Sequence, residues 1–440
     1  MSAKKKPRNA DHVRRKNRPS PSNEVIEERL KTLLRPAVLG QQGYARLLGV
    51  RNRILSFPVM VAAVLTLLWR QVPSVCELSR MLGREECLWV PRLKVSQQAL
   101  SQRFLSFPAQ LFERVLWELL PKLNQRWQER QRPLPVSVVQ AKKHFRELWI
   151  ADGSTLEAMF RKLKALEELP RGTLAGKMCT VVDLASRLPR HVWFTDQPLA
   201  HDTNFLDALL QVSRAGTLWI LDRGFYDFHF FEQLIDLGAA WISRSKSNLV
   251  YQVREVLTDN DRIRDRLIAV KGCCHPLRLV EVRLGRQWYS YLTSVLDPNV
   301  LPPAIVADLY RRRWRIEEAF LIVKRVLNLS YLWTGSENGI LLQIWSTWLF
   351  FAVLVDLGDE VAEQLMIEFD RISLEMLIRG LYHFSVAYQN GLAEDPVKYF
   401  AAPENRDLGV IKRLRKKRST EADPGAWDHS IDDLTALDFA

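Results

Sequence analysis

Two stretches, 147-ELWIADGST-155 and 217-TLWILDRGF-225, decide which fold this chain is expected to adopt. Each is a short apolar run that ends in an aspartate, Asp152 in the first and Asp222 in the second. Short apolar runs bounded by glycine-containing turns are typical of buried strands. Sites in open α/β sheets are built where such strands end. The two stretches therefore predict neighbouring strands that bring two carboxylates to one edge of a sheet.

The segments around these stretches alternate between strand and helix patterns. Further β-rich runs cover Met178–Val182, His191–Phe194 and Ala239–Ser243, and amphipathic helices are expected at Asn204–Val212 and Phe228–Leu237. The resulting order is strand, strand, strand, helix, strand, helix, strand, which is the order of the ribonuclease-H-like fold. We therefore expect an α/β protein with a mixed sheet and helices on both faces.

Shifts in composition and periodicity divide the rest of the chain. We expect a disordered basic arm (1–22), a helical DNA-binding domain (23–130), a ribonuclease-H-like catalytic domain (145–245 and 300–335), a β-rich insertion (246–299), C-terminal helices (336–395) and a mostly flexible tail (396–440). The insertion follows from period-two alternation, as in Leu277–Leu284. The basic arm could be a solvated tail or a segment that contacts phosphates. The tail carries a second basic cluster, Lys412–Arg418.

Two short helices are predicted in the N-terminal domain, at Ser74–Gly83 and Val95–Phe104. Paired short helices can present one helix to a DNA groove, although any small helical domain can show the same pattern. The polar residues of the second helix would suit contacts to base edges or phosphates: Gln97, Gln98, Ser101, Gln102 and Arg103.

A long helix is predicted from Pro303 to Leu329. At about 100° per residue, four of its polar residues fall in a stripe roughly 60° wide beside the apolar face: Tyr310, Arg313, Glu317 and Lys324. Taken alone, this pattern is also that of an exposed, salt-bridged helix face.

The two strand-end aspartates favour a functional interpretation of the stripe, because Glu317 would add a third carboxylate to the same edge. Three carboxylates close together repel one another unless a cation neutralises them. All-oxygen clusters suit Mg²⁺ or Mn²⁺. The sequence therefore predicts a metal site formed by Asp152, Asp222 and Glu317.

These residues resemble the signatures of bacterial insertion-sequence transposases of the DDE superfamily, specifically the "insertion sequence four" family. The resemblance rests on three blocks: Asp152-Gly-Ser-Thr, Asp222-Arg-Gly-Phe-Tyr and Tyr310-x2-Arg313-x3-Glu317-x6-Lys324, the last of which matches the family's YREK signature. It covers roughly residues 95–350 and includes neither the first 90 residues nor the tail after 390.

The resemblance implies a transposase that excises an insertion element at its ends and transfers the strands into target DNA. Asp152, Asp222 and Glu317 would hold two Mg²⁺ ions, for which Mn²⁺ can substitute. Tyr310, Arg313 and Lys324 would bind DNA phosphates. The family also implies a homodimer on paired double-stranded DNA ends. A flipped base could stack on Trp288 or Tyr289, although Trp288 could equally be a core residue.

Several neighbouring polar residues are weaker candidates. Arg223, Arg244 and Lys246 could bind phosphates along the DNA path, and Arg223 could instead form an ion pair that stabilises a turn. Asp183 and Asp227 are expected to be structural. Asp202 is expected to cap the helix that follows it.

The bulk composition agrees with a nucleic-acid partner and argues against other classes. The chain has 63 Lys and Arg against 50 Asp and Glu, a formal net charge of +13 that favours a polyanion. The five cysteines lack disulfide or zinc spacing. Polar residues interrupt the apolar run Ile340–Val355, so a buried helix is favoured over a membrane span.

We therefore expect a cytoplasmic, nucleoid-associated bacterial enzyme with no membrane partner and no small-molecule substrate. The alternatives are a site-specific DNA nuclease or a domesticated DNA-binding relative of the same fold. A membrane-associated protein is a third reading.

Overall fold

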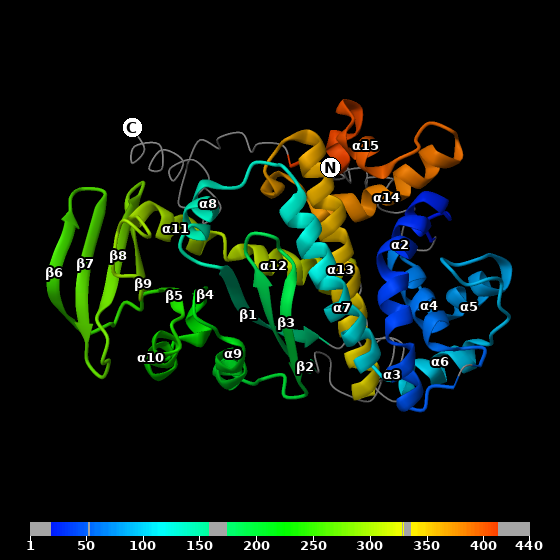
Figure 1. Cartoon of the computed structure of the whole chain (residues 1–440), viewed down its shortest axis with the longest axis horizontal. Coiled ribbons are helices and arrows are strands. Elements are labelled where there is room, and N and C mark those ends of the chain that lie inside the picture. The colour runs from blue at the N-terminus through cyan, green and yellow to red at the C-terminus, as the bar shows by residue number, and fades with distance from the viewer. Residues whose placement is uncertain (1–18, 52, 158–173, 328, 330–335, 412–440) are drawn as a thin grey trace, which may run out of the picture. The chain divides into compact units, whose positions relative to one another are not determined.

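A computed structural model describes residues 19–51, 53–157, 174–327, 329 and 336–411. The basic residues up to Arg18 and the cluster Lys412–Arg418 lie outside the described residues. Contacts within the chain define two compact units (Figure 1). The first comprises residues 1–132, 157–173 and 321–411, and the second comprises residues 133–156, 174–320 and 412–440.

The second unit is built on a nine-stranded sheet with the order β3-β2-β1-β4-β5-β9-β8-β7-β6. Its strands are β1 (Glu147–Glu157), β2 (Leu174–Asp183), β3 (Pro189–Thr195), β4 (Thr217–Leu221), β5 (Ala240–Arg244), β6 (Tyr251–Asp259), β7 (Ile263–Val270), β8 (Leu277–Leu284) and β9 (Gln287–Thr293). Strands β1, β4 and β5 are parallel, and β3 and β9 pair antiparallel to β2 and β5. The predicted fold class, a mixed ribonuclease-H-like sheet flanked by helices, is confirmed.

Three tryptophans mark the register of the central strands. Trp149 in β1 pairs with Trp219 in β4, which pairs with Trp241 in β5, and all three belong to one buried apolar cluster. Helices α9 (Leu206–Val212) and α10 (Phe228–Asp236) contribute to the same cluster and cover this face. Side chains alternate along a strand, so the even-numbered residues of these strands point to the opposite face.

Helix α11 (Pro303–Arg311) packs against β5 and β8. Its Tyr310 ring lies 5.4 Å, between centroids, from the ring of Tyr291 in β9. Tyr291 pairs with the even-numbered Arg244 of β5, so α11 lies on the face opposite the tryptophans. Helices therefore cover both faces, as the sequence predicts.

The single helix predicted from Pro303 to Leu329 is wrong, because the helix is interrupted. Helix α11 ends at Arg311, α12 covers Trp314–Leu321, and a π-helical turn, η5, covers Ile322–Val326. At the interruption the amide of Arg313 donates to the carbonyl of Tyr310, three residues back, at 3.1 Å. A helical projection at a constant angle therefore does not extend from Tyr310 to Lys324.

A buried carboxylate accompanies this interruption. Asp308 accepts hydrogen bonds from Arg311 at 2.6 Å and from Arg312 at 2.7 Å. Burial would raise the pKa of Asp308, but the two guanidinium groups outweigh it and lower the pKa. The carboxylate is therefore ionised and holds both arginines beside the turn that leads to Arg313.

The predicted β-rich insertion is confirmed as the antiparallel strands β6 to β9 (Figure 1). It continues the central sheet, because β9 pairs with β5 through Ser243↔Leu292 and Arg244↔Tyr291. A buried ion pair, Arg278 to Asp265 at 2.6 Å, joins β8 to β7. Arg278 also donates to the carbonyl of Leu301 at 2.8 Å, which ties these strands to the segment before α11.

The first unit is helical. Its longer helices are α2 (Glu24–Gly40), α4 (Phe57–Trp69), α5 (Val75–Arg84), α6 (Gln97–Ser106), α7 (Gln110–Glu129), α13 (Glu337–Leu365) and α14 (Leu374–Gln389). Helix α13 contacts α4, α6, α7 and α14. By length and composition α13 could cross a membrane, but 94% of its most apolar window is buried inside the protein. The prediction of a buried helix at Ile340–Val355 is confirmed.

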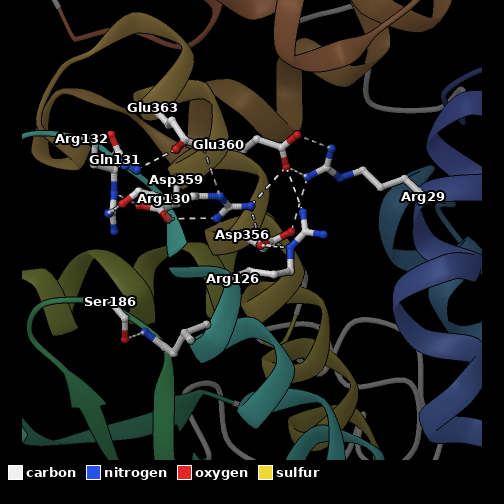
Figure 2. A network of polar contacts seen from close by, with 11 residues as sticks. Arg29, Arg126, Arg130, Gln131, Arg132, Ser186, Asp356, Asp359, Glu360 and Glu363 are labelled. Carbon is white, nitrogen blue, oxygen red and sulfur yellow. Dashed lines mark hydrogen bonds and ion pairs between the residues drawn. The ribbon is translucent and has the colours of Figure 1, made fainter. Parts of the chain in front are cut away.

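An ionic network of arginines and carboxylates covers the second half of α13 (Figure 2). Its members are Arg29, Arg126, Arg130 and Arg132 with Asp356, Asp359, Glu360 and Glu363. Arg130 is central, since it contacts Asp356 at 2.7 Å, Asp359 at 2.9 Å and Glu360 at 3.1 Å. The network ties α2, α7 and the segment after α7 to α13.

The two short helices predicted in the N-terminal region are present as α5 and α6. Ser74 caps α5 and Ser96 caps α6, each by accepting a hydrogen bond from the amide three residues on. Among the described residues, Cys76, Cys87, Cys179, Cys273 and Cys274 are all free thiols.

Candidate active site

The two predicted aspartates lie side by side where the pairing of β1 with β4 stops. Strand β4 ends before Asp222, as predicted, whereas β1 continues past Asp152 to Glu157, so the prediction that the first strand ends at Asp152 is wrong. The register pairs Ala151 with Leu221 and Leu221 with Ser243. Asp152, Asp222 and Arg244 each lie one residue further along, on the face that α11 covers. The sequence pattern therefore predicted the position of both acids correctly.

Arg313 brings the third acid to this edge, because its guanidinium contacts all three carboxylates. It lies 3.0 Å from Asp152, 3.3 Å from Glu317 and 3.8 Å from Asp222. The Arg313 side chain is 8% exposed, whereas Asp222 and Glu317 are each 38% exposed. The arginine is thus at the base of the cluster, and two carboxylates remain open to solvent.

This cluster contains fewer positive than negative side chains. Burial raises the pKa of Asp152 to about 7; Arg313 lowers it, and the carboxylates of Asp222 and Glu317 raise it again. Burial lowers the pKa of Arg313, but Asp222 and Asp152 outweigh burial and raise it. When all three carboxylates are ionised, one guanidinium leaves the cluster a formal charge of −2, which a divalent cation would neutralise.

Tyr310 extends the site along the sheet. Its hydroxyl donates to Asp222 at 3.3 Å, and burial together with Asp222 raises the pKa of Tyr310 to about 12. The phenol therefore stays protonated and remains a donor at neutral pH.

The insertion contributes aromatic side chains to the same face. Tyr291 packs on Tyr310, and Arg244 lies over the ring of Tyr289 at 5.3 Å. Trp288 is on the other face of β9, where Arg264 covers its ring at 4.3 Å. Of the two aromatic candidates in the insertion, only Tyr289 therefore shares a face with the acids.

The other predicted cations have identifiable contacts. Arg223 donates to the backbone carbonyl of Ser245 at 2.7 Å, so its contact at the turn is a backbone hydrogen bond. Lys246 lies over the ring of Tyr226 at 4.5 Å. Both side chains are exposed. Lys324 lies in η5, in the first unit, whereas the acids belong to the second unit.

The expected structural aspartates are confirmed, and the expected role of Asp202 is wrong. Asp183 accepts from the amide of Ser186 at 2.7 Å, and Asp227 caps α10. The 3-10 turn η3 (Asp202–Phe205) is capped by His201, not by Asp202. Asp202 instead forms an ion pair with Lys177 of β2 at 2.7 Å.

Sequence reasoning missed this Lys177–Asp202 pair as part of the site. The carboxylate of Asp202 lies against Gly153 and Gly224, which follow the two acids in the chain. Lys177 is 25 residues before Asp202 in the sequence, and no local pattern relates them. The available signal was the glycine close behind each acid, which marks a close approach by another group.

The carboxylates fit a divalent cation in chemistry and charge. Their oxygens are the ligands that Mg²⁺ and Mn²⁺ prefer. In the part of the chain that the structure describes, no three His, Cys, Asp or Glu side chains form a ready metal site. The guanidinium of Arg313 lies among the three carboxylates. The carboxylate oxygens that a divalent cation requires are therefore present, and this guanidinium lies between them.

Comparison with known proteins relates this region to a known domain family. Residues 143–353 match the family model of the transposase DDE domain. The region resembles a DDE transposase. The match covers just under half of the chain and includes every residue of the acid cluster.

A curated relative agrees with the DDE match. The protein named "Putative transposase y4zB" of Sinorhizobium fredii (strain NBRC 101917 / NGR234) is 27% identical over 199 residues. The alignment covers 42% of this chain and 54% of the relative, so the chain spans about half of that relative's length. Both comparisons relate the matched region to transposases.

Proposed function

We propose that the chain is a DDE transposase of the "insertion sequence four" type, which cleaves DNA at the ends of its own element and joins those ends to target DNA. The observation that carries the proposal is the grouping of Asp152, Asp222 and Glu317 around Arg313 within a region similar to transposase DDE domains. The remaining charge of −2 supports a reaction that depends on a divalent cation.

Asp152, Asp222 and Glu317 are the proposed ligands of two Mg²⁺ ions, with Mn²⁺ as a substitute. When bound, the ions supply charge neutralisation at the phosphate and lower the pKa of the attacking water or hydroxyl. Phosphate approach would draw Arg313 away from the carboxylates, because a guanidinium binds phosphate oxygens in the same bidentate manner. Arg313 would then hold the phosphate and leave the acids to the metal.

The remaining side chains of this face would position the DNA strand. Tyr310 offers a protonated hydroxyl beside Asp222. Arg244 and Lys246 follow β5 away from the acids, and both already lie over aromatic rings. Arg223 and Lys324 are assigned to phosphate contacts on the family signature alone. Tyr289 is the proposed stacking partner for a base, because Trp288 faces away.

Helices α5 and α6 are the proposed DNA-reading surface. An open pocket of about 450 Å³ lies between α5 and the segment that leads into α6, lined by Ser79, Arg80, Gly83, Arg84, Lys94, Val95 and Ser96. Arg80 pairs with Glu77, but within the described ranges neither Arg84 nor Lys94 has an ion-pair partner. Gln97, Gln98 and Gln102 of α6 are exposed. Free cations beside exposed amides suit a phosphate backbone and a groove.

Binding of a labelled duplex at several salt concentrations tests this surface. We expect Arg84→Gln and Lys94→Gln each to weaken binding and to reduce the salt slope by about 1. Arg406→Gln, an exposed arginine elsewhere, is the control. An unchanged slope in both variants would remove this surface from the proposal.

The proposed setting is a homodimer on paired DNA ends on the bacterial nucleoid. The second candidate function is a site-specific nuclease, which would cut the same ends without joining them. The exposure of Asp222 and Glu317 permits either reaction.

The deciding experiment uses a labelled duplex that carries the inverted repeat flanking the gene, a target plasmid and Mg²⁺. We expect strand cleavage at the repeat and joining of the 3′ end to the plasmid. Asp222→Asn and Glu317→Gln should lower cleavage by roughly 10³-fold or more while duplex binding persists. Asp227→Ala, which removes a helix cap, is the control. Cleavage without joining would favour the nuclease, and full cleavage by both acid variants would contradict the proposed centre.

A further inference from the structure

The feature that the proposed mechanism leaves unused is the Lys177–Asp202 pair beside the acids. Asp202 begins η3, a segment that belongs to neither of the strands carrying the acids. Its side chain is 22% exposed and that of Lys177 is 12% exposed. A largely buried ion pair next to three carboxylates requires a reason, because desolvating two charges is unfavourable.

The contacts of Asp202 with the two glycines supply that reason. A β-carbon built on Gly153 would lie 3.0 Å from Cγ of Asp202 and would overlap Oδ1. A β-carbon built on Gly224 would lie 3.1 Å from the same Cγ and would overlap Oδ2. Each carboxylate oxygen therefore contacts the backbone that directly follows one of the two acids.

The glycines are required here for space and not for backbone conformation. Neither Gly153 nor Gly224 has a positive φ, so an alanine could adopt either backbone without strain. What excludes a side chain at Gly224 is the carboxylate of Asp202, and at Gly153 it is this carboxylate together with Cε of Lys177, 2.9 Å from the built β-carbon. The two glycines and Asp202 thus form one packed arrangement across β1 and η4 (Arg223–Phe225).

Lys177 both holds and neutralises this carboxylate. Its ammonium contacts Oδ1 of Asp202 at 2.7 Å and donates to the carbonyl of Ala200 at 2.7 Å. Without Lys177, Asp202 would add a fourth negative charge to the acid cluster. With Lys177 in place, the ion pair has no net charge, and Asp202 acts through the space that its carboxylate occupies.

We propose that Asp202, fixed by Lys177, is a positioning residue whose carboxylate acts as a spacer between the backbone segments that follow Asp152 and Asp222. It sets the separation of the two acids so that both can bind one cation. This proposal rests on the proposed function, since it assumes that the acids share a metal.

A double-mutant cycle on thermal unfolding of the full chain tests the spacer without any metal. Gly224→Ala should lower the melting temperature by roughly 3–10 °C, because the methyl group overlaps Asp202. In the Asp202→Ala background the same change should have almost no effect, because the space is open. In the Asp202→Asn background the penalty should persist, because the amide has the same shape. An equal penalty for Gly224→Ala in all three backgrounds would overturn the proposal.

Binding of Mn²⁺, measured from the electron paramagnetic resonance signal of the free ion, tests the consequence. We expect Asp202→Ala to weaken Mn²⁺ binding by roughly 10- to 100-fold, as residues that orient metal ligands do. Cleavage should recover at higher Mn²⁺ concentration, while duplex affinity stays unchanged. Asp227→Ala, with a structural aspartate removed, should bind Mn²⁺ like the wild type.

The two possible failures are distinguishable. If the wild type binds no Mn²⁺, the proposed function fails, and the unfolding cycle still decides whether Asp202 is a spacer. If the wild type binds Mn²⁺ and Asp202→Ala binds it equally well, the positioning role is overturned while the proposed function stands.

Discussion

The ionic network on α13 and the acid cluster at the end of β1 and β4 are both built from arginines and carboxylates, yet they differ in balance. The network sets Arg29, Arg126, Arg130 and Arg132 against Asp356, Asp359, Glu360 and Glu363, four charges of each sign. The cluster sets Arg313 alone against Asp152, Asp222 and Glu317. The first is neutral, and the second carries a formal charge of −2.

This difference separates a structural ion network from a site. In the network every carboxylate has a guanidinium partner, so an additional cation would have nothing to neutralise. In the cluster the three carboxylates share a single guanidinium, and the carboxylates of Asp222 and Glu317 add to the rise that burial produces in the pKa of Asp152. Sites are often destabilising when their ligand is absent, because the ligand completes their charge. The imbalance therefore distinguishes the candidate site from the network independently of any sequence signature.

Removing one cation from the balanced network should have the largest effect on stability. Arg130→Met leaves Asp356 and Asp359 short of a partner, and both side chains are 1% exposed. We expect the free energy of unfolding to fall by about 3–5 kcal/mol, as for other broken buried ion pairs. Urea unfolding followed by circular dichroism measures it. Arg379→Met, which breaks a surface pair with Glu375, should change it by less than about 1 kcal/mol.

Removing the single arginine from the acid cluster should make the stability of the protein more dependent on bound metal. In Arg313→Met the three carboxylates lose their guanidinium, so added Mn²⁺ should raise the melting temperature more than it does in the wild type. At Mn²⁺ concentrations near 100 times Kd, binding is expected to raise the free energy of unfolding by about 2.7 kcal/mol. Differential scanning calorimetry with and without Mn²⁺ measures it. Arg379→Met, which lies in neither cluster, must show no extra gain; if it does, the gain does not come from the acid cluster.

Removing one acid should stabilise the unbalanced cluster. Asp222→Asn lowers its formal charge from −2 to −1, so we expect the metal-free protein to gain about 1 kcal/mol while activity is lost. Chemical denaturation in the presence of a chelator measures it. Asp359→Asn, the corresponding change in the balanced network, should be destabilising. A loss of stability in Asp222→Asn would show that Arg313 alone suffices to neutralise the cluster.

The smallest expected effect concerns His191, a half-buried ionisable group. His191 in β3 stacks on Trp193 at 5.4 Å, and burial, with Arg190 and Arg214, lowers the pKa of His191 from 6.5 to about 4. The unfolded chain therefore binds the proton more readily, and stability is lost as the pH falls from 6.5 towards 4. At pH 5 we expect a loss of about 1 kcal/mol after allowing for solvent exposure.

Urea unfolding at pH 7 and pH 5 checks this loss. His191→Gln should remove that part of the pH dependence, whereas His229→Gln, at an exposed histidine, should retain it. Equal pH dependence in all three proteins would contradict the role of His191.

The sequence predicted the parts of the site that depend on local patterns. The apolar runs before Asp152 and Asp222 fix both the register and the face of these acids, because strand periodicity is rigid, although β1 continues past Asp152. The β-rich insertion was predicted for the same reason, because its strands also show the period-two alternation. Glu317 and Arg313 were found from their spacing, although the helix that carries them is interrupted.

The parts that the sequence did not predict depend on contacts between distant residues. The break before Arg313 accompanies Asp308, whose burial and pairing with two arginines arise only in the folded chain. Asp202 looked like a helix cap, because a local hydrogen bond is the commonest use of an aspartate before a helix. Its contacts with Gly153, Gly224 and Lys177 join three segments that are far apart in sequence.

The pairing of β9 with β5 has a mechanical consequence. Hydrogen-bonded strands resist shear and bending within the plane of their sheet far more than loops do. Since Arg244 pairs directly with Tyr291, no hinge separates the tyrosines of the insertion from the strand beside Asp222. We therefore expect the distance between Tyr289 and the acids to stay constant, so that the sheet sets the spacing of the contacts that a bound DNA strand can make with both.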